Sequence, residues 1–275
     1  MDASTTPLSC DLSGHVALVT GANHGIGAAT AIILARLGAS VLLSYFRTAD
    51  PPDYPATYRE NRARTADEVL ATIHRHGGRA ISLEADLRDA RTPVRLFDYA
   101  EGELGPIDIL VNNASGWVAD TFAAPGQHAT GTTVEHISAF THDAVFSVDA
   151  RGGALTIAEF ATRHIQRRAT WGRIVGLTSG GPLGFPNEVS YGAAKAAMEN
   201  YTMAAAFELA RFGVTANVVY PPVTDTGWVT PAVREFVARS PELIHVVQAE
   251  EVAEVVAFLC SDRARLITAN VLHLR

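Results

Sequence analysis

Residues 16–27 read Val-Ala-Leu-Val-Thr-Gly-Ala-Asn-His-Gly-Ile-Gly, an apolar run followed directly by a turn with three glycines. The run predicts a buried strand, and the residues after it predict a helix to about Leu37, ended by Gly38. A plain turn from strand to helix needs only one glycine. Three glycines let the backbone approach a phosphate, which N–H groups at a helix N-terminus can bind. The stretch therefore predicts a nucleotide site lined by Gly21, Asn23, His24, Gly25, Ile26 and Gly27.

The rest of the chain alternates predicted strands with predicted helices. Strands are expected at residues 15–20, 39–46, 79–84, 107–111, 173–177, 214–219 and 270–274. Further helices are expected at residues 62–76, 91–104, 133–168 with a break near 139–141, 188–212, 231–239 and 249–261. This alternation predicts an α/β fold, with a doubly wound parallel sheet that carries helices on both faces.

A chain of 275 residues can bury a large core, so residues 1–275 are expected to form a single domain. Residues 48–61 are rich in Pro, Asp and Tyr and are predicted to be a surface insertion. Residues 220–248 hold a loop and a short helix after a predicted strand, and we expect them to form a lid over the substrate.

The composition of the chain excludes several classes of protein. A hydrophobic content of 48% with 19% charged residues is ordinary for a soluble enzyme, and the net charge of −7 argues against nucleic-acid binding. Cys10 and Cys260 are too few for a disulfide scaffold or a zinc site, and we expect no metal. No apolar run approaches the ~20 residues of a membrane span. Residues 1–13 lack the features of a secretory signal, so a cytoplasmic enzyme without a membrane partner is expected.

A second motif lies in the predicted helix 188–212. Tyr191 and Lys195 are four residues apart, so both side chains project from one face of that helix. A cation beside a tyrosine favours the phenolate and lowers the phenol pKa, which would make the pair an acid/base group. Such spacing is also a common accident. Ser179, twelve residues upstream and just after the predicted strand 173–177, favours the functional interpretation.

Taken in order, the glycine turn, the sequence Asn112-Asn113-Ala114, Ser179 and Tyr191-x-x-x-Lys195 resemble the short-chain dehydrogenase/reductase (SDR) family. The resemblance runs from about His15 to Leu274. It implies a Rossmann-like sheet and an NAD(P)-dependent oxidoreductase acting on a carbonyl or a secondary alcohol.

The same resemblance implies a role for each catalytic residue. Tyr191 would be the general acid in carbonyl reduction or the general base in alcohol oxidation. Lys195 would lower the Tyr191 pKa and bind the nicotinamide ribose, and Ser179 would orient the substrate oxygen. The hydride would come from the cofactor.

Asp149 is a departure from the family pattern, which usually has Asn in the helix before strand five. A carboxylate lacks the NH₂ donors of Asn and adds a charge. It would attract Lys195 and could hold a relay water, but it could also raise the Tyr191 pKa. We expect Asp149 to be the fourth catalytic residue, and Asp149→Asn to leave activity similar or higher.

The end of the second strand bears on the choice of cofactor. Family members that bind NAD usually place an acid there, but this chain has Tyr45, Phe46 and Arg47, with no carboxylate close. Arg47 could pair with a 2′-phosphate, so NADP(H) is favoured over NAD(H). Arg47 could also be a solvated loop cation. His24 adds weight to NADP, because family members that use NADP often have a basic residue there.

Further cofactor contacts are implied by the resemblance. The matching positions are Asp86, Leu87, Asn113, Ala114, Pro221, Val223 and Thr226. Asp86 could instead be a helix N-cap, and the asparagines could be turn residues. Pro222 stands where the family commonly has glycine, and the chain ends without the usual Asp-Gly-Gly. These departures indicate a divergent member.

Aromatic residues in the loops suggest an apolar substrate pocket, or a lid that they merely pack. They are Trp117, Phe122, Phe185, Trp228 and Phe236, with Leu183. A homotetramer is expected, with a dimer as the alternative, because the helices with Ala204, Ala205, Ala206 and with Thr156, Ile157, Phe160 resemble the tetramer-forming pair of the family. The basic run Arg163, His164, Arg167 and Arg168 could dock an acyl carrier protein or simply be solvated. The rival function is a non-catalytic sensor or scaffold that binds NADP.

Overall fold

The computed structural model describes residues 10–128, 131–180, 184–240, 243 and 245–275. Its centre is a seven-stranded sheet in the order β12-β9-β8-β4-β1-β2-β3, in which every neighbouring pair is parallel. The strands are β1 (Val16–Thr20), β2 (Ser40–Tyr45), β3 (Ala80–Glu84), β4 (Ile107–Asn112), β8 (Gly172–Leu177), β9 (Val214–Tyr220) and β12 (Asn270–His273). The predicted doubly wound parallel sheet is confirmed.

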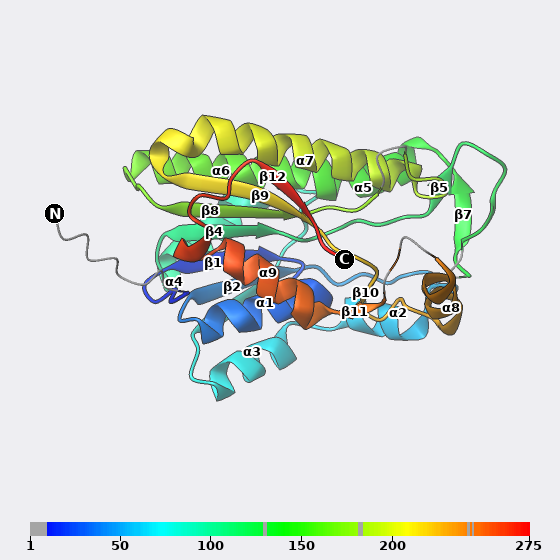
Figure 1. Ribbon diagram of the computed structural model, residues 1–275, viewed down its shortest axis with the longest axis horizontal. Helices are drawn as coiled ribbons and strands as arrows, with labels where there is room; N and C mark the ends of the chain where they lie inside the picture. The colour runs from blue at the N-terminus through cyan, green and yellow to red at the C-terminus, as the bar shows by residue number, and fades with distance from the viewer. Residues whose placement is uncertain (1–9, 129–130, 181–183, 241–242, 244) are drawn as a thin grey trace.

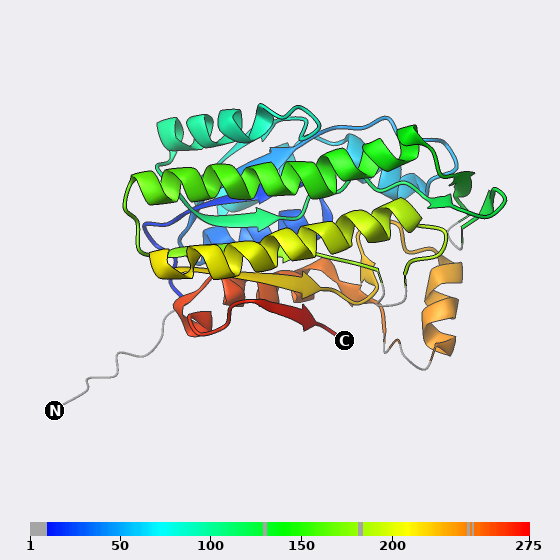
Figure 2. The ribbon, with the colours of Figure 1, turned by 90° about the horizontal axis from the view of Figure 1, so that it is seen from above.

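Helices cover both faces of this sheet (Figures 1 and 2). On one face lie α1 (Gly25–Arg36), α3 (Asp67–Arg75) and α9 (Ala249–Leu259); on the other lie α4 (Thr92–Glu103), α6 (Gly153–Gln166) and α7 (Val189–Leu209). Figure 2 shows α4, α6 and α7 running side by side. The result is the three-layer, Rossmann-like arrangement that the alternating pattern predicts.

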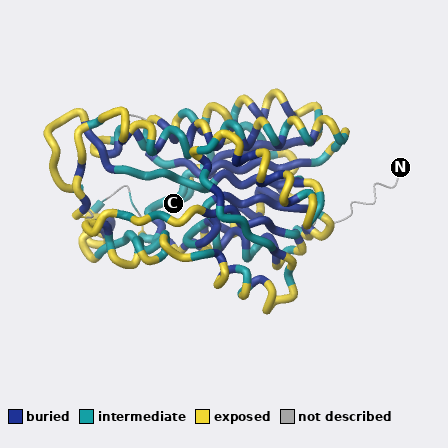
Figure 3. Tube along the Cα trace, turned by 180° about the vertical axis from the view of Figure 1, so that it is seen from behind, coloured by how far each residue is buried: buried dark blue, intermediate teal, exposed yellow. Residues whose placement is uncertain are grey.

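The core lies on both sides of the strands, which Figure 3 shows as the most buried part of the molecule. All five residues of β1 and all six of β8 are buried. Strands buried on both faces read as continuous apolar runs, and this is why the sequence pattern located them well. Leu34 of α1 and Phe160 of α6 are fully buried on opposite faces of the sheet.

The chain order reverses between β1 and β4, because β2 and β3 follow on one side of β1 and β8, β9 and β12 on the other side of β4. In open α/β sheets, ligands bind outside the carboxyl ends of the strands at this switch point. The loops that carry the predicted site residues leave the sheet at that edge.

The segment predicted to be a surface insertion contains a helix, α2 (Ala56–Ala63), and packs over the carboxyl edge of the sheet. Tyr54 within it is 9% exposed, so the segment is not only a surface loop. The single helix expected at residues 62–76 is wrong, because α2 ends at Ala63 and α3 begins at Asp67. Three prolines had suggested a loop, but Pro55 precedes the first turn of α2, where proline costs no hydrogen bond.

The region expected to be one broken helix from residue 133 to 168 differs in two ways. Residues Thr133–His136 form strand β7, beside the short strands β5 (Asp120–Thr121) and β6 (Gly126–Gln127). The helix α5 (Ala139–Phe146) starts where a break was expected, with Ser138 and Thr141 forming a capping box. The irregularity lies further on, in the π-helix η1 (Ser147–Gly152), which joins α5 to α6. Such π segments are frequent at functional sites.

The segment after β9 holds α8 (Pro231–Arg239) and a small pairing between β10 (Thr224–Asp225) and β11 (Val247–Gln248). Two short 3-10 turns, η2 (Ala210–Phe212) and η3 (Asp262–Ala264), complete the described elements. None of the helices in the described ranges is long and apolar enough to cross a membrane.

Candidate active site

The glycine turn joins β1 to the start of α1 as the sequence predicts. Gly21 and Gly25 have φ angles of +65° and +56°, a conformation that favours glycine. A Cβ on Gly21 would lie 2.9 Å from Ala114 Cα, and one on Gly25 would lie 2.9 Å from the Thr226 side chain. Gly27 packs directly against the Gly21 carbonyl. The turn is therefore a tight backbone cradle at the N-terminus of a twelve-residue helix, where no described side chain caps the first N–H groups. Such a cradle fits a pyrophosphate.

His24 and Asn23 face the segment before α3 and do not simply line the turn. The Asn23 amide donates to the carbonyl oxygens of Arg64 (3.0 Å) and Asn61 (3.4 Å). The His24 ring lies 6.3 Å from the Tyr58 ring, edge to face. Burial, and secondly the nearby Arg62 cation, lower the pKa of His24 to about 4. A neutral His24 supplies no charge to a 2′-phosphate at pH 7.

Arg47 forms an ion pair with a carboxylate at the end of the neighbouring strand. Its Nε is 3.1 Å from both carboxylate oxygens of Glu84, and a terminal nitrogen is 2.9 Å from one of them. Glu84 ends β3 directly opposite Tyr45, the last residue of β2. The expectation that no carboxylate is close to the end of strand two is therefore wrong. Tyr45 is buried, whereas Phe46 is 41% exposed with the Arg88 guanidinium over its ring.

The ends of β3 and β4 complete this side of the crevice. Asp86 accepts hydrogen bonds from the backbone and guanidinium of Arg88, so it is not an N-cap of the α4 first turn. The Asn113 amide donates to the carbonyl oxygens of Thr20 (2.8 Å) and Gly21 (3.0 Å). The Thr20 hydroxyl in turn accepts from the N–H groups of Asn113 and Ala114, both at 3.0 Å. Asn113 thus locks the glycine turn to β4.

The predicted catalytic side chains meet at the carboxyl end of β8 and the first turns of α7. A side-chain hydrogen bond joins Ser179 and Tyr191. The Lys195 ammonium lies 5.5 Å from the centre of the Tyr191 ring and donates to the Leu177 carbonyl at 3.0 Å. Lys195 is 4% exposed. The i, i+4 spacing on a helix places the two side chains together as expected.

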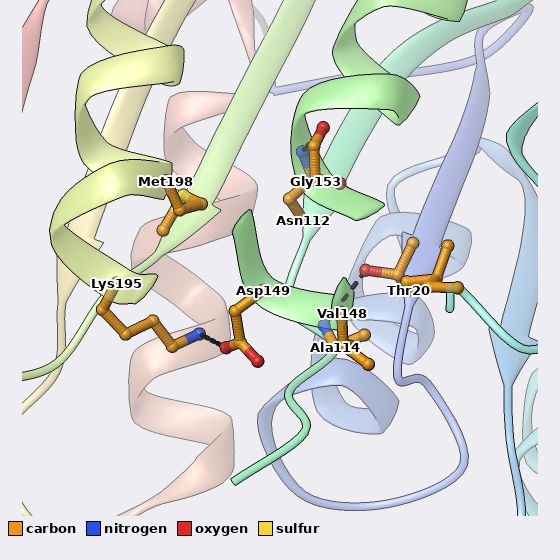
Figure 4. A pocket seen from close by; sticks show the side chains of 9 residues that line it. Thr20, Asn112, Ala114, Val148, Asp149, Gly153, Lys195 and Met198 are labelled. Carbon is orange, nitrogen blue, oxygen red and sulfur yellow. Dashed lines mark hydrogen bonds and ion pairs between the residues drawn. The ribbon is translucent and has the colours of Figure 1, made fainter. Parts of the chain in front are cut away.

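Asp149 joins this group from the π-helix. One of its carboxylate oxygens lies 2.9 Å from the Lys195 nitrogen, and the other accepts from the Gly116 N–H at 2.8 Å. Figure 4 shows Asp149 and Lys195, two of the residues that line a small cavity, pointing toward one another, with the ion pair drawn as a dashed line. The cavity is lined by Thr20, Leu87, Asn112, Ala114, Val148, Asp149, Gly153, Lys195 and Met198.

The pKa of the Tyr191 phenol is raised well above its ordinary value of 10, because the half-buried residue is shielded from water and because the negative charges of Asp149 and Glu188, and of Tyr58 when it is ionised, disfavour the phenolate. The hydrogen bond from Ser179 acts in the opposite direction. The net direction of this pKa shift is opposite to the lowering expected from Lys195, whose ammonium lies 2.9 Å from Asp149. The alternative that a carboxylate at position 149 raises it agrees with the structure.

Sequence reasoning missed a polar and aromatic cluster beside Tyr191. Glu188, buried just before α7, accepts from the Trp117 indole N–H at 2.7 Å and pairs with His128 at 2.9 Å. Trp117 also packs edge to face against Tyr54 and Tyr58, with ring centres 5.3 and 6.5 Å away. The one sequence feature from which this cluster could have been predicted is the acidic Glu188, three positions before Tyr191.

The lid segment reaches the glycine turn and α2. Asn61 donates to the Thr226 carbonyl at 3.2 Å, and Gly227 (φ +102°) lies so close that a Cβ would be 2.6 Å from the Asn61 amide. Pro221 and Val223 lie before this contact and are half-buried. Residues 241, 242 and 244 of the predicted lid lie outside the described ranges.

Other candidate residues have different surroundings from those expected. Phe185 packs near Tyr191, at 6.1 Å between ring centres, whereas Phe122 and Phe236 are 74% and 60% exposed. Leu183 lies outside the described residues. Arg163 is bound by three carboxylates, which weakens the case for a free basic docking run. Over the described ranges, no cluster of three or more His, Cys, Asp or Glu is arranged to hold a metal.

Comparisons with known proteins agree with this geometry. A family model described as Enoyl-(Acyl carrier protein) reductase matches residues 21–274. The chain is 34% identical over 262 residues to a cis-4-hydroxycyclohexanecarboxylate dehydrogenase of Sinomonas cyclohexanicum, covering 94% of both chains. It is 32% identical over 254 residues to a 3-oxoacyl-[acyl-carrier-protein] reductase of Synechocystis, covering 92% of each. Its structure matches that of the angucycline C-6 ketoreductase LanV with bound NADP, at a TM-score of 0.77 and 28% identity, over 96% and 95% of the two chains.

Proposed function

The chain belongs to the short-chain dehydrogenase/reductase family, and we propose that it is an NADP(H)-dependent oxidoreductase acting on a carbonyl or secondary alcohol. One observation carries the proposal. Ser179, Tyr191 and Lys195 meet beside the glycine turn, at the switch point of the sheet. A proton donor and a dinucleotide cradle at one edge are what hydride transfer to a carbonyl requires.

The residues around the switch point would hold the cofactor. The cradle of Gly21 and Gly25 at the start of α1 suits the pyrophosphate, and Asn113 fixes its shape. Lys195 donates one hydrogen bond to the Leu177 carbonyl and forms an ion pair with Asp149, and an ammonium has three N–H donors, so it can also donate to the nicotinamide ribose. The nicotinamide, when bound, supplies or accepts the hydride.

Side chains of this protein carry out the proton transfer. In reduction, Tyr191 gives its phenolic proton to the carbonyl oxygen, and Ser179 holds that oxygen by a hydrogen bond. In oxidation, the Tyr191 phenolate takes the proton from the alcohol. The bond between Ser179 and Tyr191 keeps both groups aimed at one point.

NADP(H) remains the favoured cofactor. Tyr45 stands where a ribose-binding acid would favour NAD, and the LanV ketoreductase carries NADP in its structure. Arg47 is close enough to the end of β2 to meet a 2′-phosphate. Glu84 works against this, because its carboxylate neutralises Arg47 and would repel the phosphate.

We propose a ring ketone or ring alcohol as the substrate. The Phe185 ring lies 6.1 Å from the Tyr191 ring, and the flat Trp117 side chain is bound to Glu188, three residues before Tyr191. Two similar proteins bear names that state a cyclohexane carboxylate and an angucycline as their substrates. An apolar, aromatic wall favours such a flat or ring-shaped carbonyl compound.

We further propose a cytoplasmic homotetramer. Five of the six residues that marked the two helices for this comparison are buried within the chain itself, as Thr156, Phe160 and Ala206 illustrate. The exposed apolar residues on the same layer include three aromatic ones, Phe207 (76%) and Tyr201 (46%) on α7 and Phe140 (75%) on α5. Large exposed aromatic residues on neighbouring helices favour contact with a second copy.

The test is turnover of a panel of ring and chain ketones with NADPH, measured by loss of the reduced-nicotinamide absorbance. We expect reduction of at least one ring ketone by the natural chain, and its loss in Tyr191→Phe, which keeps the ring and removes the proton. Activity that survives in Tyr191→Phe would overturn the proposed role. No turnover with NADPH bound would favour the rival sensor function, for which the Asp149–Lys195 pair is the supporting observation.

A further inference from the structure

The surroundings of residue 149 are built for a carboxylate. Both of its oxygens face donors, the Gly116 N–H at 2.8 Å and the Lys195 ammonium at 2.9 Å. An asparagine has one acceptor oxygen, so its NH₂ group would face one of these two donors. The side chain of Asp149 is 0% exposed and that of Lys195 is 5% exposed. The geometry therefore selects the charged residue over the usual amide.

We propose that Asp149 is a positioning residue that pairs with the Lys195 ammonium beside Tyr191 and offsets its charge, so that Tyr191 stays a neutral proton donor over the neutral pH range and alcohol oxidation gains rate as the pH rises above it. This inference rests on the proposed function, because it specifies the protonation state in which that site works.

The contacts of the ammonium support the first step. The Lys195 nitrogen lies 2.9 Å from an Asp149 oxygen, donates to the Leu177 carbonyl at 3.0 Å, and lies over the face of the Tyr191 ring at 5.5 Å from its centre. A buried opposite charge at 2.9 Å cancels most of the field that the ammonium exerts beyond it. The phenolate form of Tyr191 thus loses most of the electrostatic stabilisation that a nearby cation would give it.

The other groups that face Tyr191 work in the same direction. Glu188 precedes it by three residues and is buried, and its carboxylate is held by Trp117 and His128. Tyr58 of α2 adds a second phenol to its surroundings. The hydrogen bond of Ser179 works in the opposite direction and favours the phenolate. Burial and these neighbours together hold the pKa of Tyr191 well above its ordinary value.

The pH dependence of catalysis follows from the protonation state. Reduction uses the phenol, which stays the dominant form until the pH reaches the Tyr191 pKa. Oxidation uses the phenolate, whose fraction falls tenfold for each pH unit below that pKa. A raised pKa therefore makes the rate of oxidation keep rising with pH beyond pH 7, whereas the equilibrium of the reaction at each pH is unchanged.

The first experiment needs no substrate. The ultraviolet absorbance of tyrosinate is recorded against pH for the natural chain and for Tyr191→Phe, with circular dichroism showing where the fold is lost. The difference between the two curves is the titration of Tyr191. We expect Tyr191 not to ionise at or below about pH 10, which is the pKa of free tyrosine. A Tyr191 that does not ionise at any pH below that of unfolding would also agree with the proposal. Ionisation of Tyr191 below about pH 10 would overturn the proposal.

The second experiment compares Asp149→Asn with Asp108→Asn. Asp108 also pairs with a cation, Arg167 at 2.9 Å, but it lies in β4 near the opposite edge of the sheet. We expect Asp149→Asn alone to lower the pH at which the rate of alcohol oxidation levels off, by as many units as the Tyr191 pKa falls.

The outcomes separate this inference from the proposed function. A natural chain that turns over, with an Asp149→Asn variant of unchanged pH profile, would contradict the inference alone. A chain that binds NADPH and reduces no ketone would contradict the proposed function, while the Tyr191 titration would still test the charge arrangement. If Asp149→Asn does not fold, the titration of the natural chain decides.

Discussion

Arg47 and Glu84 form a fork-shaped ion pair where β2 and β3 end side by side, with contacts of 2.9 to 3.1 Å. The guanidinium that would meet a 2′-phosphate is thus already bound by a carboxylate. Glu84 is 32% and Arg47 50% exposed in their side chains, so the pair is solvated and readily exchanged. A phosphate must displace Glu84 or share Arg47 with it.

Replacing Glu84 by Gln should strengthen NADPH binding, because it removes the charge that competes for Arg47. An exposed pair of this kind is worth under about 1 kcal/mol, so we expect about a two- to fivefold lower Kd for NADPH and little change for NADH. Fluorescence titration of both cofactors measures the effect. Asp98→Asn, which removes a carboxylate from an exposed pair on α4, is the matched control. An equal gain for both cofactors would contradict a 2′-phosphate at Arg47.

Stability should fall in mild acid because His24 is buried as the neutral base. Its pKa is lowered from 6.5 to about 4. Between these two values the unfolded chain binds a proton that the folded chain does not, so stability is lost as the pH falls through this window. Melting temperatures between pH 7 and pH 4 should decrease less steeply in His24→Gln than in the natural chain. Exposed His142→Gln serves as the control, and parallel curves for all three chains would contradict a buried neutral His24.

Asn61 links α2 to the lid, and its removal should loosen both. It donates to the Thr226 carbonyl, while its own carbonyl accepts from Asn23 in the glycine turn. Asn61→Ala should cost about 1 kcal/mol of unfolding free energy and speed proteolysis within residues 48–63. NADPH should slow that cleavage if the segment lies over the bound cofactor. Asn200→Ala on the exposed face of α7 should leave the cleavage rate unchanged. Equal rates for all chains would show that α2 is not held by this contact.

The proposed tetramer predicts a response at Phe207. A charge in an apolar contact leaves an unpaired charge in the interface, so Phe207→Glu should lower the mass measured by light scattering after gel filtration. Val94→Glu, on the 44% exposed position of α4, should not. A natural chain that is already monomeric would contradict the assembly.

The local pattern of apolar residues was sufficient to predict the strands of the central sheet. Strands such as β1 and β8 are buried on both faces, so their apolar runs mark them without tertiary information. The glycine turn and the Tyr191–Lys195 pair were also predictable, since each depends on residues a few positions apart.

The remaining differences arise where distant segments meet. Helix α2 was missed because its mean hydropathy is low and its support comes from Asn23 and Thr226, far along the chain. Glu84 was missed as the partner of Arg47, although the parallel register of neighbouring strands brings their ends together. The ion pair between Lys195 and Asp149 depends on the π-helix, which places Asp149 beside the Lys195 ammonium. That helix could not be predicted from local pattern.

The central claim is that this edge of the sheet binds a nicotinamide dinucleotide with a preference for the phosphorylated form. Its most direct test is the binding of NADPH and NADH, measured side by side by the fluorescence of the reduced nicotinamide, because no substrate has to be known. The account predicts that both bind and that NADPH binds more tightly. Tighter binding of NADH would contradict the cofactor assignment, and binding of neither would contradict the dehydrogenase function itself.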